Sequence, residues 1–290
     1  MNRILTEDLI KAYQRKLEDE EKAKLTVQKY IRDIQKFYRF LPDKKNITRE
    51  RILSYKQYLK ENYCVSSANS MLVALNLFLE YGGWGELRVR QFKIQRQFFC
   101  REDRFLSKSE YKRIVSAAEK KGDVQLSLIL QTICSTGIRI GELKYIDVNA
   151  INSGLVTIHN KGKSRIIFLT RKLTLLLKRF CHKHGIRKGA VFLSKKGMPI
   201  DRSIVWRKMK YLCLEAGVEE KKVFPHNLRH LFAFTFYQNY KDLLRLAEVL
   251  GHSSVETTRI YTAATGQEHV KMLEKLGLVY ETINEEKIIT

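Results

Sequence analysis

The sequence has few cysteines and prolines and no long apolar run, and each of these shortages excludes a class of protein. Its five cysteines are widely spaced and none forms a CxxC pair, which argues against a zinc site or a disulfide framework and favours a reduced, cytosolic chain. No stretch of about 18 uninterrupted apolar residues occurs, so no segment is expected to span a bilayer. The first residues lack the apolar core of a signal peptide. Only 3 prolines and 15 glycines interrupt a chain rich in charged helix formers, which predicts a mainly helical protein.

Acidic residues are also scarce relative to basic ones. The chain has 54 Lys and Arg against 31 Asp and Glu, a formal net charge of +23 over 290 residues. The surplus is spread along the chain, because residues 1–100 carry a net charge of +8 and residues 101–290 carry +15. A positive field of this size indicates a polyanionic partner, and nucleic acid is the first candidate because phosphate contacts supply most non-specific affinity. The alternative partner is a membrane surface. The alternative without any partner is a charged surface that is simply solvated.

The hydrophobic pattern divides the chain into two domains. Residues 1–95 are expected to form a bundle of helices, the first of them capped by Thr6, because apolar residues recur there at helical spacing. Residues 96–104 are basic with weak helical periodicity and are predicted to be a linker. Residues 105–290 are predicted to be helical with one β-hairpin, in which alternating strands flank the turn signal NKGK at residues 160–163.

Two short stretches of the second domain place basic residues in unusual surroundings. In STGIRIGEL, Arg139 follows a glycine that ends one helix, and its burial in an apolar segment requires an anionic partner. Glu142 is the expected partner, and a purely structural Arg–Glu pair is the simpler interpretation of this stretch taken alone. The hairpin turn HNKGKSR carries Lys161 and Lys163, either of which is expected to project from the turn toward a ligand or into solvent.

Two further stretches place histidines near helix ends. In FPHNLRH, Pro225 is typical of a first helical turn, so His226 and Arg229 are expected to share one face near a helix N-terminus, where anions bind. In LGHSSVETTRIYT, His252 is expected in the tight connection after a helix-ending glycine. Tyr261 is expected about two turns into the next helix. A capped helix start and a packing tyrosine are the structural alternatives.

Together these residue types suit phosphoryl transfer without a metal ion. Two guanidiniums can hold the non-bridging oxygens of a phosphodiester and neutralise the charge that grows in the transition state. A tyrosine hydroxyl can attack phosphorus and form a covalent intermediate, and a lysine can protonate the leaving oxygen. The sequence shows no carboxylate cluster of the metal-binding kind, so no metal ion and no cofactor are expected.

The four stretches, in this order and approximate spacing, resemble the tyrosine recombinase (phage integrase) family over roughly residues 5–280. The resemblance is to the compact, two-domain form of the Xer-type and invertase-type proteins, without an extra arm-binding domain before Thr6. It implies a mainly α fold with a small β-sheet. A helical, SAM-like core-binding domain and a mixed α/β catalytic domain are expected to form a C-shaped clamp on DNA.

The resemblance also implies how the phosphate is bound and attacked. Tyr261 is implied to be the nucleophile that forms a 3′-phosphotyrosine. Arg139 and Arg229 are implied to bind the scissile phosphate, and Glu142 to support the arginine.

Proton transfer is assigned in the same way. His226 is implied to accept a proton, and His252 to donate a hydrogen bond to the phosphate. Lys161 is implied to be the general acid and is preferred over Lys163, because the family's lysine precedes the turn glycine. One departure is Leu231, where the family more often has a small or hydroxyl residue, and it affects packing only.

The implied function is site-specific recombination, in which DNA is cut and rejoined to integrate, excise, invert or resolve a DNA element. The expected place is the cytoplasm, on the nucleoid. A type IB topoisomerase and a non-catalytic DNA-binding protein of the same fold are the competing interpretations, and a basic RNA-binding helical protein is a more distant one.

The expected partners are a double-stranded DNA site and further copies of the same chain in a tetramer on DNA, with accessory DNA-binding proteins left open. Residues 262–290 have a net charge of −2 and an amphipathic pattern, which makes them a poor DNA ligand. The tail of about 267–290 is therefore expected to contact a neighbouring protomer, as the family resemblance implies. Packing of this helix on its own domain is the alternative.

Overall fold

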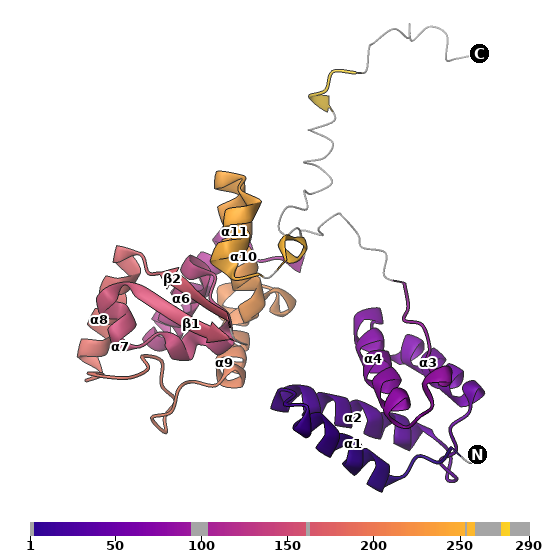
Figure 1. Ribbon diagram of the computed structural model, residues 1–290. Helices are drawn as coiled ribbons and strands as arrows, with labels where there is room; N and C mark the ends of the chain where they lie inside the picture. Colours follow the sequence, from indigo (N-terminus) through magenta and orange to yellow (C-terminus); the bar gives the residue numbers. More distant parts are fainter. Residues whose placement is uncertain (1–2, 94–103, 161–162, 253, 259–273, 279–290) are drawn as a thin grey trace, which may run out of the picture. The chain divides into compact units, whose positions relative to one another are not determined.

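The chain divides into two units, Met1–Arg96 and Gln97–Thr290, each with its own hydrophobic core (Figure 1). The structure is a computed structural model that describes residues 3–93, 104–160, 163–252, 254–258 and 274–278. The predicted linker of residues 96–104 lies almost wholly outside these described residues and stays a prediction.

The first unit is built from amphipathic helices. Its described α-helices are α1 (Glu7–Asp19), α2 (Lys24–Phe40), α3 (Arg49–Asn62) and α4 (Val65–Tyr81), followed by a short 3-10 turn, η1 (Gly85–Leu87). Thr6 caps α1 as predicted, because its hydroxyl accepts a hydrogen bond from the backbone nitrogen of Leu9 at 3.1 Å. The predicted helical bundle is therefore confirmed.

Aromatic side chains join these helices in the core of the first unit. The rings of Phe37 and Tyr55 lie 4.9 Å apart and connect α2 with α3. The rings of Tyr13 and Phe78 lie 5.2 Å apart in an edge-to-face arrangement and connect α1 with α4. All four of these residues are at most 2% exposed, so each helix is held by buried contacts rather than by its own propensity.

The second unit is helical with one two-stranded antiparallel sheet, as predicted. Its elements in chain order are α5 (Lys108–Lys120), α6 (Val124–Thr136), η3 (Ile140–Tyr145), α7 (Val148–Ser153), β1 (Leu155–Asn160), β2 (Lys163–Phe168), α8 (Arg171–Lys183), α9 (Arg202–Ala216), η4 (Glu220–Lys222), α10 (Pro225–Tyr240), α11 (Leu243–Leu250) and η5 (Val255–Thr257). The strand register runs from Leu155 opposite Phe168 to Asn160 opposite Lys163. The hairpin turn between the strands, residues 161–162, lies outside the described residues.

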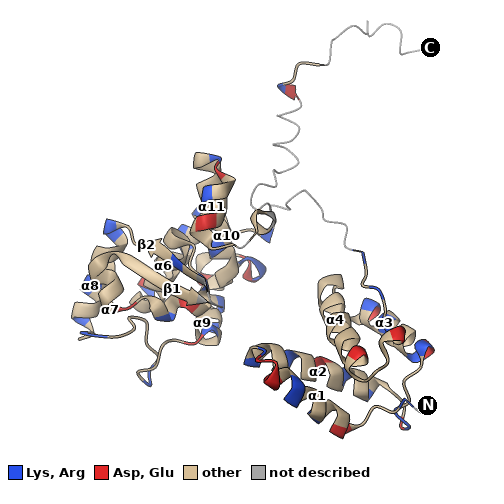
Figure 2. Cartoon of the chain, in the orientation of Figure 1, with Lys and Arg blue, Asp and Glu red and all other residues tan. Residues whose placement is uncertain are grey.

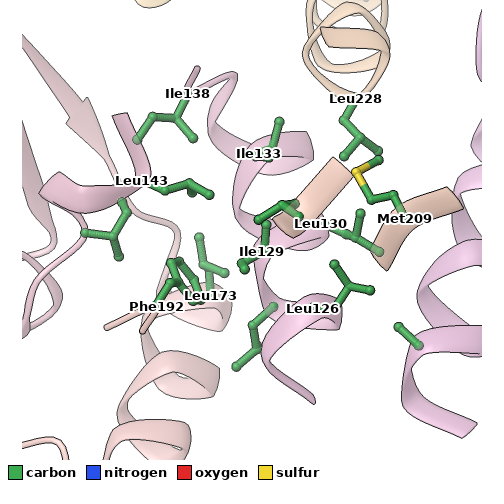
Figure 3. Packing of buried hydrophobic residues seen from close by; sticks show 14 of the residues in the cluster. Leu126, Ile129, Leu130, Ile133, Ile138, Leu143, Leu173, Phe192, Met209 and Leu228 are labelled. Carbon is green, nitrogen blue, oxygen red and sulfur yellow. The ribbon is translucent and has the colours of Figure 1, made fainter. Parts of the chain in front are cut away.

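Helix α6 lies at the centre of the second unit (Figure 3). Its buried side chains meet residues from three other helices: Leu126, Ile129, Leu130 and Ile133 pack among Leu173 of α8, Met209 of α9 and Leu228 of α10. Five consecutive residues of this helix, from Leu126 to Leu130, are buried, so it is enclosed on most of its sides. The C-terminal end of α6, which leads into Arg139, is therefore held in the interior beside α10.

The predicted fold class, mainly α with a small β-sheet, is confirmed. No helix in the described part of the chain has the length and apolar character needed to cross a membrane. The expected C-shaped clamp concerns the arrangement of the two units and stays an expectation.

Candidate active site

Gly137 places Arg139 at the end of α6. Gly137 has a left-handed backbone (φ +65°), and a Cβ atom there would lie 2.5 Å from the ring of Phe232. Only glycine fits both constraints, so the chain can turn sharply out of the buried helix. Arg139 then precedes η3 with an extended backbone, and its side chain remains 40% exposed.

Arg229 is held by the backbone at the ends of two helices. It lies in α10, which begins at Pro225 as predicted, and only 2% of its surface is exposed. Its Nη1 donates to the carbonyl oxygen of Gly137 at 2.5 Å, and its Nη2 donates to that of Leu250 at 2.8 Å. These carbonyls end α6 and α11, where the helix dipole stabilises a cation. The guanidinium is therefore fixed in place before any ligand binds.

His252 lies directly after Gly251, which ends α11 in the left-handed conformation (φ +63°) as predicted. Its Nε2 lies 3.0 Å from Nη2 of Arg229, and its Nδ1 lies 2.8 Å from Oγ1 of Thr258. Burial and, next, the positive charge of Arg229 lower the pKa of the imidazole to about 4. The ring is therefore neutral at neutral pH, and its tautomer decides which nitrogen can donate.

Glu142 binds two arginines, of which the sequence indicated only one. Its Oε1 accepts from Nη1 of Arg139 at 3.1 Å, and its Oε2 accepts from the Arg139 backbone nitrogen at 2.9 Å. Its Oε2 also lies 2.6 Å from Nη2 of Arg165, whose side chain is 13% exposed. Arg165 additionally donates to the carbonyl oxygen of Leu250. Burial lowers the pKa of Arg165 below its usual value, so this cation depends on the Glu142 carboxylate.

The alternation of the hairpin contains a signal for Arg165. Ile167 of β2 is buried opposite Val156, and Arg165, two residues earlier, faces the same side opposite Ile158. An arginine at an inward-facing strand position requires a buried acceptor. Residue alternation thus identifies Arg165 as an unusual position, although it cannot identify Glu142 as the acceptor.

Arg139 and His226 form the solvent-accessible side of the site. His226 lies in the first turn of α10 and is exposed. Partial desolvation and then the positive charges of Arg229 and Arg139 hold the pKa of His226 below its usual value. An incoming anion therefore meets one exposed guanidinium, one buried guanidinium and a neutral imidazole that can accept a proton.

The structure brings together most of the predicted site residues: Arg139, Glu142, His226, Arg229 and His252. Lys161 and Tyr261 lie outside the described residues, so their positions stay predictions. Most of the tail of about 267–290 lies outside them as well. Across the residues that the structure does describe, no group of three or more His, Cys, Asp or Glu side chains is placed to hold a metal ion.

Known proteins resemble the chain in both sequence and fold. Residues 104–268, more than half of the chain, match the model of the phage integrase family. Tyrosine recombinase XerH of Campylobacter jejuni subsp. jejuni is 36% identical over 168 residues, which cover 54% of this chain and 48% of that protein. Tyrosine recombinase XerA of Pyrococcus horikoshii is 28% identical over 291 residues, which cover 97% of each chain. The crystal structure of a lambda integrase tetramer bound to a Holliday junction has the same fold, with a TM-score of 0.71 and 19% identity over 87% of this chain and 76% of that one.

Proposed function

Because the chain belongs to the phage integrase family and is a tyrosine recombinase, an enzyme that cleaves and rejoins DNA at specific sites, we propose that Tyr261 is its nucleophile. The Tyr261 hydroxyl attacks the scissile phosphorus, the bond from phosphorus to the 5′ oxygen breaks, and a 3′-phosphotyrosine forms. The 5′ hydroxyl of a second strand then attacks the phosphotyrosine, the bond from phosphorus to the Tyr261 oxygen breaks, and a phosphodiester is restored as the tyrosine hydroxyl is regenerated. The number of phosphate ester bonds is conserved, so the exchange needs no external energy source.

The observation that carries this proposal is the convergence of Arg139, Arg229 and His252 at the ends of α6 and α11. Backbone carbonyls hold Arg229 and a buried carboxylate holds Arg139, so both guanidiniums are oriented before a phosphate arrives. Donors fixed in this way stabilise the growing negative charge of the transition state without reorganising during the reaction. A protein that only binds DNA needs basic surface residues but no preorganised donors within its interior.

Proton transfer falls to the two remaining groups of the proposed set. The lowered pKa of His226 leaves its imidazole neutral at neutral pH, so it can accept the proton of the attacking Tyr261 hydroxyl. Lys161 supplies a proton to the leaving 5′ oxygen, and we prefer it to Lys163 as the general acid. His252 donates a hydrogen bond to a non-bridging oxygen of the phosphate.

DNA is the partner of both units in this proposal. Lys and Arg residues occur in each of them (Figure 2). In the first unit, a groove between α2 and α4 is lined mostly by basic and hydroxyl side chains, with one carboxylate, Asp33, that pairs with Lys29 at 2.7 Å. The basic and hydroxyl residues of the groove are Lys29, Arg32, Lys36, Tyr63, Ser66, Ser67 and Ser70. Side chains of these types bind phosphate oxygens and fix a protein on the duplex without reading its sequence.

Further copies of the same chain are the second partner, which the tetramer of the structurally similar lambda integrase supports. We propose that the tail of about 267–290 makes the contact between protomers on DNA. The need for accessory DNA-binding proteins, and a location in the cytoplasm on the nucleoid, belong to the same proposal.

The test compares covalent protein–DNA complexes trapped from cells that produce the wild type or Tyr261→Phe, followed by sequencing of the attached DNA. We expect adducts at one short, partly palindromic site in the wild type and none in Tyr261→Phe, with DNA binding retained in both. Tyr211→Phe is the matched control, because Tyr211 is a 72% exposed residue of α9 outside the site. Adducts scattered over the genome would instead indicate a topoisomerase, and equal adducts in both proteins would exclude Tyr261 as the nucleophile.

A further inference from the structure

Thr258 contacts His252 although no catalytic role has been assigned to it. Thr258 is fully buried directly after η5, and its backbone nitrogen donates to the carbonyl oxygen of Val255 at 2.8 Å. Its Oγ1 lies 2.8 Å from Nδ1 of His252. It also stands three residues before Tyr261 in the sequence. The hydroxyl therefore connects the histidine of the site to the segment that carries the proposed nucleophile.

A contact of the ring with Arg229 determines the direction of this hydrogen bond. Nη2 of Arg229 lies 3.0 Å from Nε2 of His252, and a guanidinium can only donate. Nε2 must therefore be the acceptor, which places the proton of the neutral ring on Nδ1. Nδ1 then donates to Oγ1 of Thr258, so the threonine hydroxyl is the acceptor in the absence of DNA.

The proposed role of His252 in the reaction requires the opposite arrangement. If Nε2 is to donate to a phosphate oxygen, a neutral ring must carry its proton on Nε2 and leave Nδ1 as an acceptor. A threonine hydroxyl has one donor and two acceptor sites, so it can accept from Nδ1 in one state and donate to Nδ1 in the other. In this change of tautomer, Nδ1 loses its proton to water and Nε2 gains a proton from water, so the ring gains or loses no net proton.

We propose that Thr258 is a positioning residue, whose hydroxyl holds the His252 ring in place in both neutral tautomers and so allows Nε2 to turn from an acceptor of Arg229 into a donor to the phosphate. This inference rests on the proposed function, because it presumes that His252 binds the scissile phosphate. A valine has nearly the shape of threonine but can neither donate nor accept, whereas a serine keeps the hydroxyl.

The kinetic test measures the first-order rate of covalent complex formation by the full chain on the DNA site recovered from the trapping experiment. Thr258→Val is expected to lower this rate roughly 10- to 100-fold, by analogy with the loss on removing a group that orients a metal-ligating imidazole, with unchanged DNA affinity. Thr258→Ser is expected to stay within about threefold of the wild type, because it keeps the hydrogen bond. In a His252→Ala background, Thr258→Val is expected to cause no further loss.

A ¹⁵N NMR measurement of the His252 ring supplies a readout that a merely structural role would not move. In a Tyr261→Phe background, we expect the Nδ1–H tautomer without DNA and the Nε2–H tautomer on DNA. Thr258→Val is expected to keep the Nδ1–H tautomer that Arg229 imposes without DNA, but to shift and broaden the Nδ1 signal in both states, because Nδ1 loses its hydrogen-bond partner. A wild-type rate in Thr258→Val, or the same loss with and without His252, would overturn the inference, as would ring signals that ignore Thr258→Val. If His252→Ala itself cleaves at the full rate, the proposed role of His252 fails and the catalytic part of the inference with it. The response of the Nδ1 signal to Thr258→Val would still show whether Thr258 holds the ring.

Discussion

Removal of the Glu142 carboxylate is expected to destabilise the second unit strongly, because it leaves a buried cation without its counter-charge. Glu142 is 5% exposed and its partner Arg165 has a side chain only 13% exposed. Removing one member of a buried ion pair costs about 3–5 kcal/mol. Arg139 adds little to this cost, because its 40% exposed side chain is rehydrated. Arg165 keeps its hydrogen bond to Leu250, so we expect Glu142→Ala to lower the free energy of unfolding by about 3 kcal/mol.

The two tryptophans allow this loss to be measured in one unit of the full chain. Trp84 lies in the first unit and Trp206 on α9 of the second. In a Trp84→Phe background, Trp206 fluorescence during urea denaturation reports the second unit alone. The control is Glu215→Ala, which removes the partner of Lys121 at 3.0 Å in a pair whose side chains are 36% and 47% exposed. This exposed pair is expected to contribute less than about 1 kcal/mol.

A double variant separates the unpaired charge from other effects of the substitution. Arg165→Met removes the cation itself, so adding it to Glu142→Ala is expected to recover about 1–2 kcal/mol of the lost stability. The reasoning is refuted if Glu142→Ala costs no more than Glu215→Ala, or if Arg165→Met recovers nothing in the Glu142→Ala background.

Three other predictions follow from particular positions. Gly137→Ala is expected to lower the free energy of unfolding by about 2–3 kcal/mol in thermal unfolding, because backbone strain at φ +65° adds to the overlap of the new Cβ with the ring of Phe232. The control is Gly154→Ala, which has φ +75° but open space around its Cβ and should cost about 1 kcal/mol. Equal losses of stability in the two variants would contradict the overlap. Burial lowers the pKa of His230 to about 4, below its unfolded value of about 6.5, so the unfolded chain binds a proton first and stability falls as pH falls through this window. His230→Phe should reduce the stability lost between pH 7 and pH 5 by about 2 kcal/mol in urea titrations, and an unchanged loss would contradict this. Deletion of residues 267–290 is expected to impair synapsis and recombination more than binding to a single DNA site, and an unchanged recombination rate would count against the tail contact.

The local elements of the fold were predictable from the sequence because their causes are local. The Thr6 cap, the helix start at Pro225 and the helix end at Gly251 each depend on residues within one or two turns. The hairpin follows from alternation around a turn signal, and the pair of Arg139 with Glu142 spans only three residues. The motif residues could likewise be named, because their types and order suit one chemistry and resemble one family.

Only the tertiary structure decided how those residues are held. The hydrogen bond from Arg229 to the carbonyl oxygen of Gly137 joins positions 92 residues apart. Every residue has a backbone carbonyl, so the sequence does not show which one accepts this bond. Arg165 reaches Glu142 across 23 residues from a strand that alternation alone could not orient toward any partner. These contacts depend on how α6, α10, α11 and the hairpin pack around a shared core. The sequence by itself determines which helices, strands and reactive groups this protein has, whereas packing over long sequence distances decides which donor meets which acceptor and so brings two arginines and a histidine together.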